Sequence, residues 1–233
     1  RRALYHALDR AAIVEARYSG FANVATALVP AWHWLHDASN EGVVYDPTLA
    51  TELLAEAGYS GASPLEFELM VTPASIDQEL AVILQAQWAA VGVDVSIRTV
   101  EGATRTAIIA GRDGQDPDQY KAALWQQNLS GSTTDEYIQK FYASEGTLNR
   151  MFVNQEGGYT DPELERLITE ARSAPLREDS RALYRQAIEI LEQSVPLIPI
   201  AYLQNVTAVS SAVHDYTPIG THSFAITGVW LDR

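Results

Sequence analysis

Two short segments concentrate side chains that could bind a small molecule. The first carries four aromatic rings close together, Trp32, His33, Trp34 and His36, and the second places three amides after an indole ring, Trp125, Gln126, Gln127 and Asn128. An indole offers a large rigid face to an apolar side chain or a sugar ring, and an amide both donates and accepts hydrogen bonds. Both segments are therefore candidate ligand-binding sites. The alternatives are core packing for the tryptophans and solvent exposure for the glutamines.

The histidines also raise the question of a metal site. His33, His36 and Asp37 form an H-x-x-H pair followed by an acid, but this spacing is a weak signal on a loop. The acidic stretch 112–119 lacks the alternating spacing and terminal glutamate of a calcium-binding loop, so it is interpreted as a solvated turn. Neither a metal site nor a cofactor is predicted, and aromatic packing over a sheet is the preferred role of the tryptophans beside the histidines.

Motifs of catalysis are missing from the sequence. It contains no G-x-S-x-G elbow, no glycine-rich phosphate loop and no H-E-x-x-H. Two pairs of carboxylates on predicted helices are interpreted as exposed helix charge, Glu163 with Glu165 and Glu189 with Glu192. An enzyme is not predicted. The alternative is a glycoside or amide hydrolase that uses two cleft carboxylates with a histidine of the first segment.

Composition narrows the class of protein. The chain has 233 residues, 47% of them hydrophobic, and 30 acidic against 16 basic side chains give a formal charge of −14, which favours a globular protein that does not bind nucleic acid. The lack of cysteine excludes disulfides, thiolate catalysis and iron–sulfur clusters. The sequence shows no signal peptide or membrane-length apolar run and begins inside an amphipathic helix, so we expect it to be part of a longer protein.

The elements that must position the two segments follow an α/β pattern. Apolar alternation predicts a strand over 65–71 and another over 93–100, with a helix over 76–91 between them that begins at a Ser75–Gln78 capping box. This order indicates a parallel crossover, and a strand over 121–125 would place Trp125 at its carboxyl end. The other predicted elements are helices over 3–20, 47–57, 103–110, 134–142, 162–173 and 178–195, a structured loop over 21–45, and strands over 197–203 and 206–209.

Four segments carry a resemblance that goes beyond secondary structure. They are RRALYHALDRAAIVEARYSG, VYDPTLATELLAEAGY, KAALWQQN and YTDPELERLITEARSAPLREDSRALYRQAIEILEQSVPLIPIAY. Their order and spacing resemble those of the family 5 solute-binding proteins, the dipeptide, oligopeptide and nickel binders of ABC importers. The last segment is the most specific, because Arg181, Tyr184, Pro196 and Pro199 fall at matching places.

The resemblance implies an architecture and a role. Such proteins have two α/β lobes that close on a ligand. Residues 1–203 would form the second lobe, of the periplasmic binding protein-like type II class with a mixed sheet and flanking helices, and residues 204–233 would return to the first lobe. The protein would be a non-catalytic receptor in the periplasm, or lipid-anchored at the outer face of the cell membrane, that hands peptide-like or other small polar solutes to an ABC permease. A sensory ligand-binding module is the alternative from another class.

The resemblance also points to ligand-binding residues. The candidates are Trp125, Gln127 and Asn128 after the strand, with Trp32, His33 and Trp34 from the loop. In the peptide binders of the family, a carboxylate three residues after the tryptophan pairs with the α-ammonium group of the ligand, and that place is Asn128 here. A neutral amide holds a cation less strongly than a carboxylate does, so peptides, oligosaccharides or polyols, and metal chelates all stay open as ligands.

Overall fold

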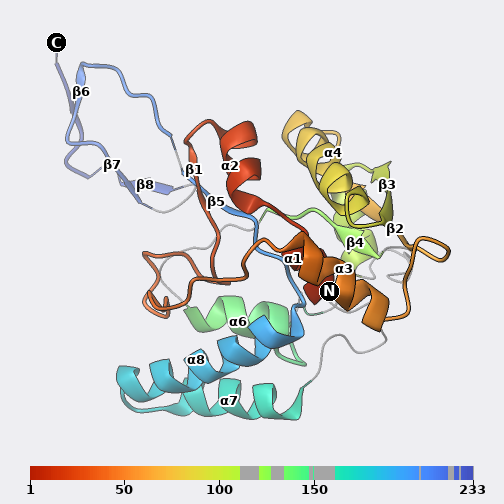
Figure 1. Ribbon diagram of the computed structural model, residues 1–233. Coiled ribbons are helices and arrows are strands. Elements are labelled where there is room, and N and C mark those ends of the chain that lie inside the picture. The colour runs from red at the N-terminus through yellow and green to blue at the C-terminus, as the bar shows by residue number, and fades with distance from the viewer. Residues whose placement is uncertain are drawn as a thin grey trace.

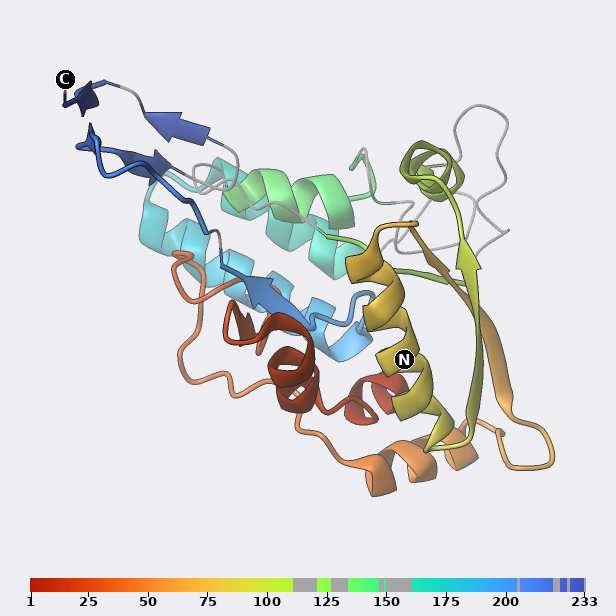
Figure 2. The same ribbon diagram turned by 90° about the horizontal axis from the view of Figure 1, so that it is seen from above.

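The protein is built around a small parallel sheet with helices on both faces (Figures 1 and 2). The structure is a computed structural model that describes residues 1–110, 121–126, 134–146, 149, 161–204, 206–219, 223–225 and 227–232. Two hydrophobic cores lie on opposite faces of the sheet, which confirms the predicted α/β class. Within the described ranges, no helix is long and apolar enough to span a bilayer.

The sheet contains three described strands. These are β2 (Leu65–Val71), β3 (Val93–Thr99) and β4 (Ala122–Ala123), with β2 in the middle and parallel to both neighbours. The predicted crossover is confirmed, because α4 (Ser75–Ala89) connects β2 to β3. Side chains alternate across a strand, so Leu69 and Val71 join the core beside α4, whereas Met70 joins the core of the C-terminal helices. Coverage of both faces is typical of parallel strands.

The start of α4 differs from the prediction. Ala74 is the N-cap residue and no side chain caps the helix, so the predicted Ser75–Gln78 capping box is wrong. Gln78 Nε2 instead donates to the carbonyl oxygen of Thr72 at 2.6 Å and to Thr99 Oγ1 at 3.0 Å. These contacts tie the helix to the carboxyl ends of β2 and β3, which the local capping signal did not anticipate.

The N-terminal region forms two helices, so the prediction of one helix over 3–20 is wrong. α1 (Arg2–His6) and α2 (Arg10–Tyr18) are separated at Asp9, whose carboxylate accepts a hydrogen bond from Ala12 N at 2.9 Å. Asp9 N also donates to Gln87 Oε1 of α4 at 2.8 Å. The chain turns at Asp9 because a capping carboxylate and a tertiary acceptor satisfy N–H groups that a continuous helix would bond internally.

A short antiparallel ladder joins two segments that are far apart in the sequence. β1 (Ala22–Val24) opens the predicted structured loop and pairs with β5 (Ala201–Leu203). The strand predicted over 197–203 therefore forms only at its end. The strand predicted over 206–209 is wrong, because all four residues are irregular. Pro199 has no N–H to donate to a ladder, which accounts for the late start of β5.

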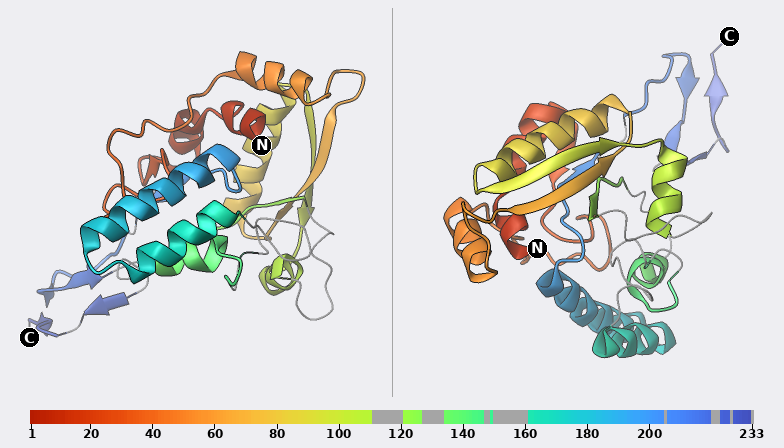
Figure 3. Two further views of the ribbon diagram at one scale, coloured as in Figure 1. Left: turned by 90° about the horizontal axis from the view of Figure 1, so that it is seen from below. Right: turned by 90° about the vertical axis from the view of Figure 1, so that its right-hand side faces the viewer.

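The remaining helices confirm the predicted ones. They are α3 (Pro47–Glu56), α5 (Gly102–Ala110), α6 (Thr134–Tyr142), α7 (Pro162–Ser173) and α8 (Arg177–Ser194). Asp46 caps α3 through Leu49 N at 2.9 Å, and Asp161 caps α7 through Glu163 N, also at 2.9 Å. α7 and α8 lie side by side and complete one core with α6 (Figure 3).

The C-terminal segment projects away from the body as a narrow arm (Figures 1 and 2). Its described strands are β6 (Val213–His214), β7 (Thr217–Ile219), β8 (Ser223–Ala225) and β9 (Trp230–Leu231), paired antiparallel as β6 with β9 and β7 with β8. Several of its large apolar side chains are exposed, namely Val206, Val209, Trp230 and Leu231. None of the described residues of the arm belongs to either hydrophobic core.

Candidate functional site

The larger cavity, of about 260 Å³, lies beyond the carboxyl ends of β2 and β4. Its walls come from the loop after β1, the start of α4, the residues that follow β4, and the segment 197–203, with one tyrosine each from α2 and α6. Ligands of open α/β sheets bind outside the carboxyl ends of the strands, so this position is the expected one for a binding site.

Trp125 forms the wall at the end of β4. Leu124 N donates to the carbonyl oxygen of Met70 at 2.9 Å and so extends the pairing with β2 by one residue. The strand is shorter than the predicted 121–125, and Trp125 lies just beyond it, with its indole ring in the cavity lining. The guanidinium carbon of Arg105 lies 4.7 Å from the centre of the Trp125 ring. The backbone just before Trp125 is thus held by β2, and the face of its indole contacts the guanidinium of Arg105.

Trp32 reaches the same cavity from the loop after β1. Its side chain is 60% exposed and contacts the ring of His33 edge-on at 5.7 Å. A tight turn presents it, since His33 N donates to the carbonyl oxygen of Pro30 at 2.9 Å. The structure therefore brings together Trp32 and Trp125, the two indoles that the sequence analysis found in separate segments.

The amides that follow Trp125 are only partly covered by the structure. Gln126 is exposed and belongs to the cavity lining. Gln127 and Asn128 lie outside the described residues, as does the acidic stretch 112–119. The ligand-binding roles of Gln127 and Asn128 stay predictions.

His33 and Trp34 do not line the cavity. His33 is buried, its Nδ1 accepts a hydrogen bond from Leu35 N at 3.3 Å, and burial lowers the pKa of its imidazole. Trp34 packs edge-on against Tyr184 of α8 at 6.4 Å, with the guanidinium of Arg177 4.7 Å from its ring. Trp34 therefore packs against the core of the C-terminal helices rather than over the sheet. The ligand-binding roles of His33 and Trp34 stay predictions.

The histidine pair and Asp37 also point to separate partners. His36 Nδ1 lies 3.2 Å from the carbonyl oxygen of Val29, while Asp37 accepts hydrogen bonds from Ser39 N and Ser39 Oγ. Among the described residues, no three histidine or acidic side chains gather closely enough to hold a metal ion. The two histidines of the H-x-x-H pair therefore contact backbone groups of their own loop.

Asp77, in the first turn of α4, is a cavity residue that the sequence analysis missed. Its carboxylate accepts a hydrogen bond from the Thr72 hydroxyl and lies 3.4 Å from Arg105 Nη1. Among the described residues of the lining it is the only acid. Its charge is balanced by Arg105, so the carboxylate of Asp77 connects the start of α4 to Thr72 and to α5.

The segment 197–203 and two tyrosines were also missed as cavity residues. Tyr202 donates its hydroxyl to the carbonyl oxygen of Ala27, and burial raises the pKa of Tyr202 above its ordinary range. Tyr18 comes from the end of α2 and Tyr137 from α6, where burial raises the pKa of both phenols. All these phenols stay neutral at physiological pH. No local signal marks them, because the lining brings together residues of α2, α6 and the segment 197–203, which are far apart in the sequence.

Comparison with known proteins places this geometry in a family. Residues 1–149 match the family described as bacterial extracellular solute-binding proteins, family 5 Middle. The chain belongs to this family. The predicted resemblance to family 5 is thereby confirmed on the part of the chain that carries the sheet and Trp125.

Relatives of this family 5 chain include proteins named for different ligands. It is 26% identical over 241 residues to di/tripeptide-binding protein 1 of Pseudomonas aeruginosa, covering 96% of this chain and 41% of the relative. It is 28% identical over 229 residues to heme-binding protein A of Haemophilus influenzae, covering 96% and 40%. The chain thus spans about two fifths of the length of these curated relatives.

Solved structures confirm the periplasmic binding protein type II fold. HbpA2 from Haemophilus parasuis superposes with a TM-score of 0.81 at 26% identity, over 100% of this chain and 44% of that one. The periplasmic binding protein DppA from Helicobacter pylori, solved in complex with the peptide STSA, gives a TM-score of 0.83 at 23% identity, over 100% and 43%.

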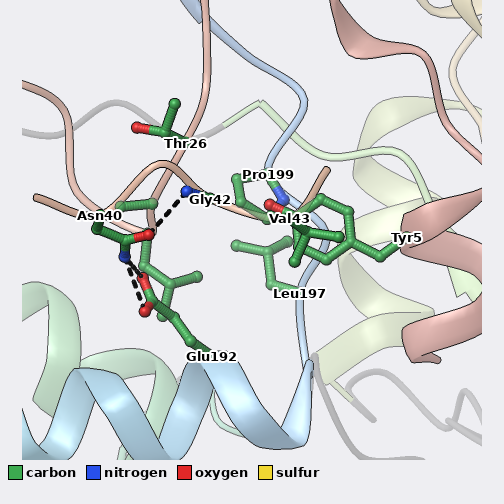
Figure 4. Close-up of a pocket in the computed structure, with 10 residues that line it drawn as sticks. Tyr5, Thr26, Asn40, Gly42, Val43, Glu192, Leu197 and Pro199 are labelled. Carbon is green, nitrogen blue, oxygen red and sulfur yellow. Dashed lines mark hydrogen bonds between the residues drawn. The ribbon is translucent and has the colours of Figure 1, made fainter. Parts of the chain in front are cut away.

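A second cavity of the family 5 chain, of about 210 Å³, lies between the loop after β1 and the end of α8 (Figure 4). Glu192 accepts hydrogen bonds from Asn40 Nδ2 on both carboxylate oxygens at 2.9 Å, and Gly42 N donates to Asn40 Oδ1 at 2.8 Å. Leu197 and Pro199 line both cavities. The loop that carries Trp32 is therefore tied to α8 beside the second cavity, which shares lining residues with the larger one.

The two predicted pairs of helix carboxylates behave differently in the structure. Glu163 fits the prediction of exposed helix charge and pairs with Arg166 at 2.6 Å. For Glu192 the prediction is wrong, because its side chain is half-buried against the loop and burial raises the pKa of its carboxyl group. Helix periodicity could not show this, since the covering residues come from a loop about 150 positions away in the sequence.

Proposed function

We propose that this chain is part of a non-catalytic receptor that captures small polar solutes and hands them to an ABC permease. The observation that carries the proposal is the convergence of Trp32 and Trp125 on one cavity at the sheet edge where α/β folds bind ligands. Membership in a family of extracellular solute-binding proteins supports the same role. It also supports a location in the periplasm or, through a lipid anchor, at the outer face of the cell membrane.

In this proposal residues 1–203 form the second lobe of the receptor and residues 204–233 return to the first. The greater length of the relatives supports this division. So does the projecting arm, which leaves Val206, Val209, Trp230 and Leu231 without a core to join among the described residues. Hinge closure of the two lobes would cover the cavity and bury the solute.

Light scattering on the isolated chain tests the division. Exposed apolar side chains of the arm should drive self-association, and the fragment 1–203 should associate less than the chain 1–233. A monomeric chain 1–233 that binds solute tightly would contradict the proposal, because half of the proposed cleft would then be dispensable.

Peptide-like solutes are the first ligand class that we propose. The names of several relatives, such as the di/tripeptide-binding protein, support it, and the apolar wall formed by Trp32, Leu80 and Trp125 suits amino-acid side chains. A sugar or polyol is the second candidate. It is favoured by Gln126 in the lining and by Asn128, an amide where a carboxylate would pair with a peptide's ammonium group.

A hydrolase is not favoured by the cavity. Hydrolysis by paired carboxylates needs a second acid near the first. Asp77 has no acidic neighbour among the described lining residues, and its charge is directed at Arg105.

Thermal unfolding of the full-length parent protein with peptides, oligosaccharides and metal chelates tests the function. A ligand of the folded state raises the melting temperature, and Trp125→Ala should reduce the rise. Val82→Ala is the control, because this exposed side chain of α4 lies outside the cavity lining. A rise with peptides or with sugars selects between the ligand classes, and no rise with any class would overturn the receptor role.

A further inference from the structure

We infer that Arg105 is a positioning residue that sets the orientation of the Trp125 indole and thereby the affinity of the cavity, without lining the cavity itself. The inference rests on the proposed function, whose ligand Trp125 would contact. It is carried by the contacts that Arg105 makes with the end of β4 and with α4.

Arg105 holds both the backbone and the ring at the end of β4. From the first turn of α5, its Nη1 donates to the carbonyl oxygen of Leu124 at 2.6 Å, and its guanidinium carbon lies 4.7 Å from the centre of the Trp125 ring. The peptide group that leads into Trp125 and the face of its indole are thus bound by one planar group. Trp125 and Leu124 line the cavity, whereas Arg105 does not.

The guanidinium is itself oriented from the other side. Arg105 Nη1 lies 3.4 Å from Asp77 Oδ2, and these side chains are only 13% and 21% exposed. Asp77 in turn accepts hydrogen bonds from the hydroxyl and the N–H of Thr72 at the end of β2. The network therefore runs from β2 through α4 and α5 to the end of β4, and it places a charge-balanced guanidinium against the indole.

Geometry rather than charge alone is what this position requires. A planar guanidinium can stack on an aromatic ring and donate in its plane at once, whereas a lysine ammonium is a compact point charge that does not stack. Arg105→Lys should therefore restore the ion pair with Asp77 but only part of the hold on Trp125.

The test is a double-mutant cycle in the full-length parent protein, with the ligand that the thermal screen identifies. Arg105→Met should weaken binding about tenfold, as expected when a stacked, hydrogen-bonded cation is lost. In a Trp125→Phe background the same change should weaken binding by no more than about twofold, because the effect passes through the indole. Arg98→Met is the matched control, since Arg98 forms a partly exposed pair with Glu68 outside the cavity lining.

The protein without ligand supplies a second readout. The near-ultraviolet circular dichroism contributed by Trp125, taken as the difference between wild type and Trp125→Phe, should shrink in Arg105→Met and return in part in Arg105→Lys. An unchanged Trp125 signal would overturn the inference, and so would equal losses of affinity in both backgrounds. Should Arg105→Met not fold, Arg105→Lys is measured in the same cycle, where an affinity and a Trp125 signal both equal to wild type would also overturn it.

These outcomes separate the inference from the proposed function. A wild-type protein that binds none of the solutes, yet changes its Trp125 signal in Arg105→Met, would refute the receptor role and the effect on affinity while leaving the positioning contact in place. A wild-type protein that binds solute, with Arg105→Met equal to wild type in affinity, would refute the inference alone.

Discussion

The two tryptophans of the cavity are held in different ways. Trp125 directly follows a strand of the sheet and lies against the guanidinium of Arg105, whose side chain is only 13% exposed. Trp32 is 60% exposed and lies in a loop without helix or strand between β1 and α3. The difference shows that one wall of the cavity is built into the sheet, whereas the other wall depends on the anchors of a long loop.

A single buried side chain provides the main anchor of that loop. Arg10 is 6% exposed, and its guanidinium donates to the carbonyl oxygens of Ala25 and Val43 near the two ends of the loop. It also donates to the Tyr5 hydroxyl at 3.1 Å, and burial raises the pKa of Tyr5 to about 12. The bond between Asn40 and Glu192 adds a second tie to α8 (Figure 4). The loop wall can thus be weakened without touching the sheet wall.

The largest expected effect comes from Arg10→Met. The buried carbonyl group of Ala25 and the part-buried carbonyl group of Val43 would lose their donor, so we expect the free energy of unfolding to fall by about 3 kcal/mol. Urea unfolding measures this, and amide exchange should show faster opening of the loop while Leu124 N stays protected. The exposed Arg2→Met is the control, with a change under about 0.5 kcal/mol. Equal loss of protection in both walls would contradict the comparison.

Gly42→Ala should come next. Gly42 has a φ of 74°, and a Cβ atom there would lie 2.5 Å from the carbonyl oxygen of Thr26, so both backbone strain and a clash oppose the change. We expect a loss of about 2 kcal/mol in urea unfolding. Gly58→Ala separates the two causes, because Gly58 has a φ of 90° but open space around it, and should cost about 1 kcal/mol. Equal losses of unfolding free energy at the two positions would show that the loop moves enough to relieve the clash with Thr26.

The third prediction compares the tryptophans themselves. Trp125→Ala should weaken solute binding by about 2 kcal/mol and Trp32→Ala by about 1 kcal/mol, because an ordered aromatic ring loses less freedom when a ligand binds than an exposed one does. Titration calorimetry on the full-length protein measures both. A larger loss of binding free energy at Trp32 would show that the loop wall, and not the sheet wall, is the better ordered one.

The smallest effect concerns pH. Burial raises the pKa of Glu192 above its ordinary value of 4.5, so the folded state holds this proton more tightly than the unfolded chain does. The stability due to this group is present below pH 4.5 and is lost as the pH rises through the raised pKa. Glu192→Gln should remove that slope, which urea unfolding between pH 4 and about 7 would detect.

Glu163→Gln gives a control of opposite sign. A hydrogen bond from Arg166 lowers the pKa of Glu163, so its stabilisation is present above pH 4.5 and is lost as the pH falls through the lowered pKa. Identical pH slopes in wild type and Glu192→Gln would show that the tie between the loop and α8 does not depend on the charge of Glu192.

Sequence signals predicted the elements whose ends are decided locally. The Asp-Pro pairs at 46–47 and 161–162 predicted the starts of α3 and α7, since the capping carboxylate and the N–H groups it binds are close neighbours in the chain. Alternation predicted β2 and β3 for the same reason. The break at Asp9 was missed because helix periodicity continues across it, and the bond from Asp9 N to Gln87 that accompanies it is tertiary.

The residues of the candidate site also fall into those that local sequence marked and those that only tertiary contacts place. Residue types alone marked Trp32, Trp125 and Gln126 as candidate ligand contacts, and the cavity contains all three. Residue types also marked His33 and Trp34, which pack away from the cavity, and gave no sign of Asp77 or Tyr202, which line it. Which face a loop residue presents depends on what covers it, and the covering residues come from α8 and from β5.

By itself, the sequence determined the α/β class and the residue types available for binding, because these follow from periodicity and composition. It also carried the resemblance to family 5 in the order and spacing of four segments, which the match of residues 1–149 to the family bears out. The tertiary structure decided which of these residues meet. The pairing of β1 with β5, the anchoring of the loop by Arg10, and the contact of the Arg105 guanidinium with the Trp125 ring each join segments whose local sequences carry no record of the other partner. Long-range contacts of this kind select one arrangement through burial and hydrogen bonding, which no local pattern encodes.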